Sequence, residues 1–282
     1  MKDAGRFAEL SAPAHWQVVD IISDLHLQAS EPGTFEAWQR YLAHPPLGRA
    51  ADALFILGDL FEVWVGDDVL DAGTPATGER EFQRACAQAL HAHSLHTPVF
   101  FLHGNRDFLL GPKALEACGM QGLEDPTVLV FLGQRWLLSH GDALCLDDTD
   151  YMRFRAQVRA PAWQREFLAQ PLEQREAVAR GLRAQSEARK RDTGHDPSLW
   201  ADVDATAARE WLQSAQAATL VHGHTHRPGE HALGGPGLCR VVLSDWDAGA
   251  TPPRAEVLRL DSQGLRRLRL SPDGATPPCS TC

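Results

Sequence analysis

The sequence predicts a layered α/β protein with mixed sheets and a helical insertion. Short apolar runs alternate with amphipathic stretches along most of the 282 residues, a pattern typical of alternating strands and helices. Apolar runs joined by Gly-containing turns, near 127–140 and 254–270, indicate antiparallel hairpins. From about 148 to 201 the strand pattern stops, and an Arg-, Gln- and Ala-rich segment with helical spacing takes its place.

The first half of the chain shows the alternation most clearly. Apolar runs predict strands at 17–23, 51–58 and 97–104, and amphipathic stretches predict helices near 34–43, 78–94 and 111–118.

After the insertion, Val203, Ala207 and Trp211 recur at steps of four, which predicts a helix capped by Asp202 or Asp204. A strand at 218–223 follows, and 237–245 and 254–270 have the pattern of antiparallel hairpins.

The expected organisation is one domain with short ends. We expect a flexible N-terminal extension over 1–15, a domain over 16–271 that includes the insertion at about 148–201, and a disordered tail over 272–282. An apolar fraction of 44% is enough for a sizeable core. Cys279 and Cys282 have the spacing of half a zinc site, but without a second pair we interpret them as part of a frayed terminus.

Cysteine usage and apolar run lengths indicate the compartment. The six cysteines are scattered, and no apolar stretch near the start resembles a secretory core, so we expect a reducing cytoplasm. The apolar runs are too short to span a bilayer. Any membrane contact should therefore be peripheral.

Charge is unevenly distributed. A formal net charge of −10 disfavours a general nucleic-acid binder. Between Tyr151 and Arg191, however, the chain has nine Arg and one Lys but only four Glu, with aromatic residues interspersed. Most of these arginines suit an ordinary solvated helix face. Taken together, the basic and aromatic residues predict apolar grooves with cations beside them, which suit an amphiphilic ligand. The same basic residues favour binding to an anionic membrane surface.

Potential ligands follow five of the predicted strands. They are Asp24 and His26 in SDLHL, Asp59 in GDLFE, Asn105, Arg106 and Asp107 in GNRDF, His140 and Asp142 in SHGD, and His222, His224 and His226 in HGHTH. One such motif alone is typical of a solvated turn. Because ligands bind outside the carboxyl ends of strands in α/β sheets, five together predict a single site.

These motifs, with GDLFEVWVGDD, FLHGNRDFLLG, SHGDALCLDD and VHGHTHRPGEH around them, resemble the calcineurin-like metallophosphoesterases from about Val18 to Ser244. Within that family they are similar to the bacterial pyrophosphatases that release UMP from a diacylated UDP-sugar during lipid A synthesis. The resemblance implies an αββα sandwich with a helical lid, a nucleotide-linked glycolipid substrate, and a peripheral location on the cytoplasmic face of the inner membrane. No protein partner is indicated.

The resemblance also implies two divalent metal ions, with manganese the first choice. One would be held by Asp24, His26, Asp59 and His226, and the other by Asp59, Asn105, His140 and His224. Imidazole, carboxylate and amide donors without thiolate suit Mn²⁺, Fe²⁺ or Zn²⁺. Paired cations can clamp both oxygens of an in-line displacement and activate a water. His222 is not a ligand in the family, so we assign it a supporting or packing role.

Arg106 stands where many family members have a proton-donating His. Arginine does not give up a proton at working pH, but it binds phosphate and offsets developing charge. We therefore expect a leaving group that is already stable as an anion, as in a pyrophosphate.

By resemblance, Asn105, Arg106 and His140 are the catalytic residues. Asn105, Arg106 and His224 would contact the substrate phosphates, Asp148 the sugar and Ser186 a polar group, with Lys190 and Arg191 as further contacts. Trp64 suits either the core or the cavity wall.

Two alternatives remain open. A soluble nucleotide pyrophosphatase or diadenosine polyphosphate hydrolase of the same fold would need no acyl groove, which the basic, aromatic insertion argues against. A non-catalytic interaction module usually loses ligands, whereas all seven are present here.

Overall fold

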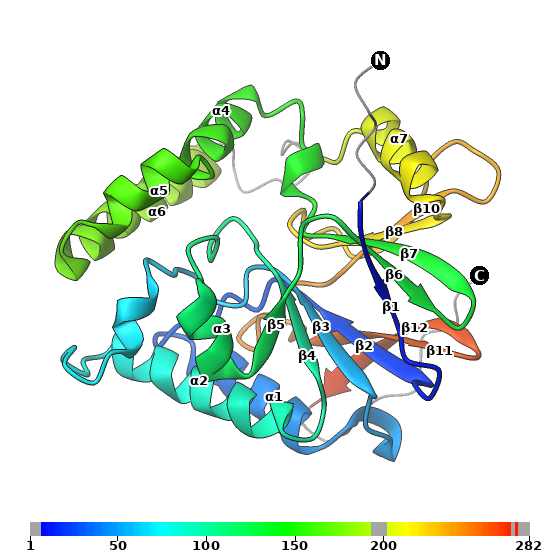
Figure 1. Cartoon of the computed structure of the whole chain (residues 1–282), viewed down its shortest axis with the longest axis horizontal. Helices are drawn as coiled ribbons and strands as arrows, with labels where there is room; N and C mark the ends of the chain where they lie inside the picture. The colour runs from blue at the N-terminus through cyan, green and yellow to red at the C-terminus, as the bar shows by residue number, and fades with distance from the viewer. Residues whose placement is uncertain (1–6, 193–201, 272–273, 276–282) are drawn as a thin grey trace.

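Two β-sheets pack face to face and carry helices on their outer faces in the computed structural model, which describes residues 7–192, 202–271 and 274–275 (Figure 1). For 185–192, 271 and 274–275 only the backbone is described. The predicted αββα sandwich of mixed sheets is confirmed.

The first sheet has the order β13-β12-β11-β2-β3-β4-β5. Its strands are β2 (Val18–Ile22), β3 (Ala53–Leu57), β4 (Val99–Leu102), β5 (Met120–Gly122), β11 (Glu256–Asp261), β12 (Gly264–Ser271) and β13 (Gly274–Ala275). From β2 to β5 neighbouring strands are parallel, whereas β11 pairs antiparallel with both β2 and β12.

The second sheet has the order β1-β6-β7-β8-β10-β9. Its strands are β1 (Ala8–Ser11), β6 (Thr127–Phe131), β7 (Gln134–Ser139), β8 (Thr219–His222), β9 (Gly229–Ala232) and β10 (Cys239–Val242). The predicted hairpins at 127–140 and 254–270 are present as β6–β7 and β11–β12. The segment at 237–245 forms β10, which pairs antiparallel with β9 but parallel with β8.

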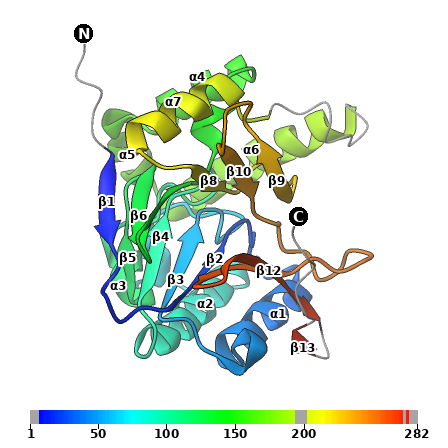
Figure 2. The ribbon, with the colours of Figure 1, turned by 90° about the vertical axis from the view of Figure 1, so that its right-hand side faces the viewer.

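Strand alternation assigns side chains to the two sides of the first sheet. In β3, Phe55 and Leu57 face the second sheet, whereas Leu54 and Ile56 pack under the outer helices. Those helices are α1 (Pro32–Ala43), α2 (Glu79–Ser94) and α3 (Pro112–Cys118), close to their predicted positions. The helix α7 (Ala205–Ala215) covers the second sheet on the opposite side (Figure 2).

Asp204 caps α7 by accepting a hydrogen bond of 2.7 Å from the backbone N–H of Ala207, one of the two caps predicted. Short 3₁₀ helices occur at η1 (Pro46–Gly48), η2 (Asp67–Leu70) and η3 (Asp142–Leu144).

The insertion forms three helices, α4 (Thr149–Val158), α5 (Pro161–Leu168) and α6 (Leu172–Asp192). We call these three helices the lid; they lie beyond the strand ends that point toward the top of Figure 1. Residues 193–201 of the predicted insertion are outside the described residues. Within the described ranges, no helix combines the length and apolarity needed to span a membrane.

Two expectations about the ends of the chain are wrong. Residues 8–11, predicted to be flexible, form β1, which pairs in parallel with β6 through Ala8 opposite Thr127. Residues 274–275, predicted to be disordered, form β13 against the end of β12. Both strands are too short to show an apolar pattern, so pairing with a preformed neighbour decides their structure.

Candidate functional site

The predicted site residues lie in loops at one end of both sheets. Asp24 and His26 follow β2, Asp59 follows β3, Asn105 follows β4, His140 follows β7, and His224 and His226 follow β8. The carboxyl ends of these five strands meet above the inter-sheet core, so residues 200 positions apart become neighbours. The structure brings all seven side chains together.

One group consists of Asp24, His26 and His226, whose possible ligand atoms all lie within 4.8 Å of one another. Nε2 of His26 is 3.3 Å from Nε2 of His226, and Nε2 of His226 is 3.4 Å from Oδ1 of Asp24. Two imidazole nitrogens and a carboxylate facing one point can hold a divalent cation.

A second group lies beside the first. Oδ1 of Asn105 is 3.0 Å from Nε2 of His140 and 2.9 Å from Nδ1 of His224. Oδ2 of Asp59 is 3.7 Å from Nε2 of His140 and 3.9 Å from Nε2 of His26. Asp59 therefore lies between the two groups, where one carboxylate can serve both.

The backbone at this site is unusual. Asp24, His26, Asp59, His224 and His226 have positive φ angles of 53°, 48°, 51°, 65° and 50°. Such angles are uncommon outside glycine, and they cluster at functional sites where the surrounding structure holds them in place. All five of these residues belong to the seven clustered side chains.

Two glycines allow the close approach of these loops. A Cβ atom at Gly104 would lie 2.0 Å from Oδ1 of Asp59, and one at Gly223 would lie 2.1 Å from Oδ2 of Asp24. Any side chain at either position would displace a carboxylate of the site. The glycines in the GN and HGH motifs are thus required by packing against Asp59 and Asp24.

The site attracts positive charge. Burial lowers the pKa of His140, but Asp59, Asp142 and Asp24 outweigh it and raise that pKa to about 9. Burial also opposes the charged form of Asp24, yet His226, His140 and His26 hold its pKa well below the usual range. Burial lowers the pKa of His224 to about 4, so this imidazole is neutral. Buried carboxylates with nitrogen donors and no thiolate fit a divalent metal ion.

Two contacts orient the histidines from outside the site. Nδ1 of His140 lies 2.8 Å from the carbonyl oxygen of Leu57, and Nδ1 of His26 lies 2.8 Å from Oε2 of Glu62. Both leave Nε2 turned toward the centre, as is typical of metal-ligating histidines. Sequence reasoning missed Glu62, because an acidic residue three positions after Asp59 has no spacing that distinguishes it from a solvated one.

Asp142, whose role sequence reasoning left open, connects the site to the lid. It accepts hydrogen bonds from the Tyr151 hydroxyl at 2.6 Å and from Nε of Arg155 at 2.8 Å, both on α4. The ring of Tyr151 stacks on that of His224 with centroids 5.8 Å apart. Arg159 donates a 2.8 Å hydrogen bond to the carbonyl oxygen of Gly104.

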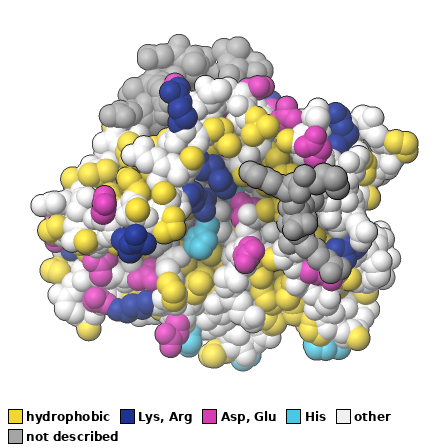
Figure 3. Space-filling view, turned by 45° about the horizontal axis from the view of Figure 1, so that its top comes forward, with side chains coloured by type: hydrophobic (Ala, Val, Ile, Leu, Met, Phe, Trp, Pro, Cys, Tyr) yellow, Lys and Arg dark blue, Asp and Glu magenta, His cyan; other side chains and the backbone are white. Residues whose placement is uncertain are grey.

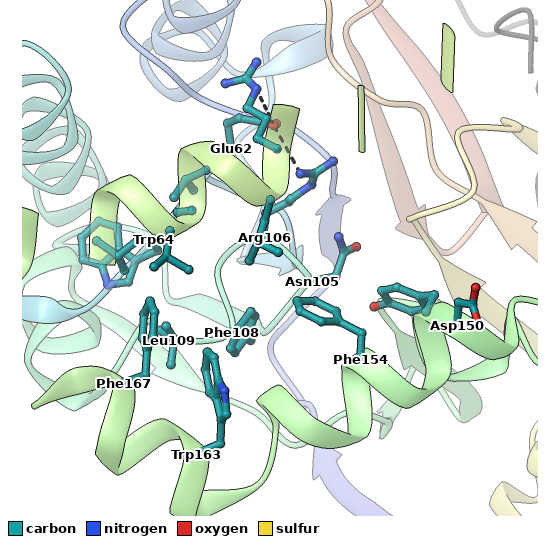
Figure 4. Close-up of a pocket in the computed structure, with 17 residues that line it drawn as sticks. Glu62, Trp64, Asn105, Arg106, Phe108, Leu109, Asp150, Phe154, Trp163 and Phe167 are labelled. Carbon is teal, nitrogen blue, oxygen red and sulfur yellow. Dashed lines mark ion pairs between the residues drawn. The ribbon is translucent and has the colours of Figure 1, made fainter. Parts of the chain in front are cut away.

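A cavity of about 630 Å³ opens between the lid and this centre. Its polar end contains Glu62, Asn105, Arg106 and Arg183, and its apolar wall includes Trp64, Phe108, Phe154, Trp163, Phe167 and Leu182 (Figure 4). Trp163 and Phe167 stack with centroids 4.7 Å apart. Figure 3 shows a histidine exposed in a hollow, with basic side chains next to it and apolar ones beyond.

Only some of the residues expected to contact the substrate can be placed at the cavity. Arg106 lines the cavity and lies 3.6 Å from Glu62. Asp148 is exposed, and its Oδ1 caps α4 by accepting a hydrogen bond from the backbone N–H of Tyr151. It is not among the described residues that line the cavity. Ser186, Lys190 and Arg191 belong to the end of α6, where side chains are outside the described residues.

Two further side chains from the motifs are buried. His222 is fully buried beside Gly141, and burial lowers its pKa to about 4, which agrees with a packing role. Trp64 is both a core residue and part of the cavity wall, since it is 1% exposed and lines the cavity.

Comparison with known proteins identifies the class. The calcineurin-like phosphoesterase family matches residues 18–228, and the chain belongs to this family. It is also 44% identical over 256 residues to the UDP-2,3-diacylglucosamine hydrolase of Xanthomonas campestris pv. campestris, covering 86% of this chain and 95% of the relative. The enzyme of the same name from Chromobacterium violaceum is 43% identical over 259 residues, covering 89% and 98%. Within the phosphoesterases, the chain is thus a member of the UDP-2,3-diacylglucosamine hydrolase group.

Proposed function

We propose that this protein is a metal-dependent hydrolase of UDP-2,3-diacylglucosamine in lipid A biosynthesis. It cleaves the pyrophosphate bond and releases UMP and 2,3-diacylglucosamine 1-phosphate. The relatives of that name support this substrate. The observation that carries the proposal is the apolar cavity whose lining includes Asn105, one of the seven clustered side chains, which contacts His140 and His224. A diacylated nucleotide sugar needs such an apolar cavity next to a centre for its phosphates.

In this proposal two divalent ions, Mn²⁺ first, are held by Asp24, His26, Asp59 and His226 and by Asp59, Asn105, His140 and His224. When bound, such a pair supplies an activated water and stabilises negative charge on the phosphate oxygens. The tight packing of Asp59 and Asp24 against Gly104 and Gly223 supports a preorganised site.

Arg106 binds the diphosphate in this reaction. Its guanidinium is at the polar end of the cavity and cannot supply a proton, so it offsets charge as the bond to phosphorus breaks. The departing sugar 1-phosphate is stable as an anion and needs no acid. Release of UMP corresponds to attack on the phosphorus nearer uridine.

The lid receives the acyl chains. Phe154, Trp163, Phe167 and Leu182 offer an apolar surface continuous with the polar end of the cavity. Within the insertion predicted over about 148–201, we assign Ser186, Lys190 and Arg191 of α6 as contacts to the sugar and its substituents. Asp148, at the exposed start of α4, is assigned to the sugar from outside the cavity lining. His224 and Asn105 are assigned as contacts to phosphate.

A lipid substrate also requires access to the membrane. Leu146, Leu168, Val178 and Leu182 are each more than 40% exposed on or next to the lid, among its arginines. Exposed apolar side chains with basic neighbours favour an anionic lipid surface. We therefore place the protein peripherally on the cytoplasmic face of the inner membrane, with no nucleic-acid partner.

UMP release tests the function directly. The purified protein with Mn²⁺ should release UMP from UDP-2,3-diacylglucosamine faster than from the same nucleotide sugar without acyl chains, and chelation should abolish turnover. Equal or faster cleavage of diadenosine polyphosphates or of the unacylated sugar would favour a soluble pyrophosphatase. No metal-stimulated turnover of any pyrophosphate would favour a non-catalytic module.

A further inference from the structure

Glu62 is a buried carboxylate that touches three parts of the site at once. Its side chain is 10% exposed and lies in the loop after β3. Oε2 is 2.8 Å from Nδ1 of His26, and Oε1 is 3.5 Å from Nε of Arg183. Oε1 is also 3.6 Å from Nη1 of Arg106, an ion pair drawn as a dashed line in Figure 4. His26 follows β2, Arg106 follows β4, and Arg183 belongs to α6 of the lid.

The first oxygen of Glu62 orients an imidazole. With its Nδ1 held by Glu62, His26 directs Nε2 toward His226, 3.3 Å away, and toward Oδ1 of Asp24, 3.9 Å away. A carboxylate on the outer nitrogen of a ligating histidine fixes the ring and increases its basicity. This contact therefore bears on metal affinity.

The second oxygen faces two arginines. At 3.5 and 3.6 Å these contacts are longer than hydrogen bonds, so attraction between charges holds the guanidinium groups while their N–H donors can still bind an anion. Among the described residues, the buried Nε of Arg106 has no hydrogen-bond partner. Nη1 of Arg183 donates to Oε1 of Gln28 at 2.7 Å, a second tie between α6 and the loop after β2.

We propose that Glu62 is a positioning residue that couples the metal-binding loop to the lid. One oxygen sets the ring of His26, and the other holds Arg106 and Arg183 side by side, where they bind the diphosphate of the substrate together. The inference rests on the proposed function, because a diphosphate is the ligand that calls for two adjacent guanidinium groups. Glu62 itself does not touch the reacting atoms.

Two substitutions separate the contact of Glu62 with His26 from its attraction of the two arginines. Glu62→Gln keeps an oxygen for His26 but removes the charge that faces the arginines, whereas Glu62→Ala removes both. The measurements are Mn²⁺ affinity by titration without substrate, and kcat and KM for UDP-2,3-diacylglucosamine. Glu116→Gln, at an exposed glutamate of α3, is the matched control.

Glu62→Gln should bind Mn²⁺ nearly as the wild type does but lose about tenfold or more in kcat/KM. Glu62→Ala should also lose about 10–100-fold in Mn²⁺ affinity. In the double variant, the losses in kcat/KM from Glu62→Gln and Arg183→Ala should be less than additive, because each single substitution already breaks the same contact between Glu62 and Arg183. The control should match the wild type.

The proposal is overturned if the two Glu62 variants lower only the melting temperature, or if Glu62→Ala keeps wild-type Mn²⁺ affinity. It is also overturned if the losses in kcat/KM from Glu62→Gln and Arg183→Ala add up in the double variant. The Mn²⁺ titration does not depend on turnover. A wild type without activity on the nucleotide sugar would therefore contradict the proposed function and leave the role of Glu62 toward His26 measurable.

Discussion

Asp59 lies between the two groups of possible metal ligands, with Oδ2 3.9 Å from Nε2 of His26 and 3.7 Å from Nε2 of His140. It is 2% exposed, and its Oδ1 accepts a hydrogen bond of 2.9 Å from the backbone N–H of Arg106 while Oδ2 faces the histidines. Its carboxylate thus organises the loop after β4 as well as the centre.

Replacing Asp59 by Ala should abolish pyrophosphate cleavage and leave a folded protein, because the inter-sheet core does not include it. The assay is UMP release, with far-ultraviolet circular dichroism as the control for folding. A rate near that of the wild type would refute a shared role for this carboxylate.

Arg106 should act mainly in the transition state. We expect Arg106→Ala to lower kcat by an amount corresponding to about 2–4 kcal/mol, as for other electrostatic stabilisers. Steady-state kinetics on the diacylated substrate distinguish this from a binding role. A rise in KM with unchanged kcat would contradict the assignment.

At the scale of elements, the lid is attached to the sandwich at several points. Arg80 of α2 pairs with Glu176 of α6 at 2.7 Å, and the buried Arg175 of α6 donates to the carbonyl oxygen of Val65 and to Asp68. With Asp142 holding α4, both the first and last lid helices are tied to the core. The cavity wall is therefore held beside the site.

Trp163 of α5 tests whether the lid receives acyl chains. It packs against Phe167 and Phe108 along the cavity wall. Trp163→Ala should lower kcat/KM for the diacylated substrate at least about tenfold, because a large aromatic surface is lost from the groove. Turnover of the same nucleotide sugar without acyl chains should be unchanged, and equal losses on both substrates would argue against an acyl groove.

At the scale of the whole molecule, ion pairs connect segments that are distant in sequence. Asp202, just before α7, pairs bidentately with Arg240 of β10 at 2.6 and 2.7 Å, and with Arg227 at 2.9 Å. Burial raises the pKa of Asp202, but Arg240 and Arg227 outweigh it and hold that pKa well below its usual value.

Since the folded-state pKa of Asp202 is depressed, its contribution to stability is present above the unfolded pKa of about 3.9 and is lost as pH falls below it. Asp202→Asn should lower the free energy of unfolding at pH 7 by about 1 kcal/mol, because the pair is partly exposed. Urea unfolding at pH 7 and at pH 3, which lies below the unfolded pKa, should show a smaller difference at pH 3. A difference that grows on acidification would contradict this sign.

Much of the site was predictable because its side chains follow the ends of strands. The five motifs contain all seven clustered side chains, and the family resemblance selected these seven from the other motif residues. Strands of an α/β sheet place their carboxyl ends together, which is why the motifs predicted one common site. Glu62 and the role of Asp142 were not predictable, because their importance depends on contacts with His26 and α4 rather than on any local pattern. The strand β1 was missed for a similar reason, as four residues acquire strand structure only beside β6.

The amino-acid sequence by itself determined the layers of the protein and the chemistry of its loops. Apolar periodicity is a local property, and each motif carries its own donor atoms. Only the tertiary structure decided which donors face each other, how α4 and α6 are tied to the site, and where the apolar cavity opens. Those features arise from contacts between segments far apart along the chain, and no local pattern encodes such distances.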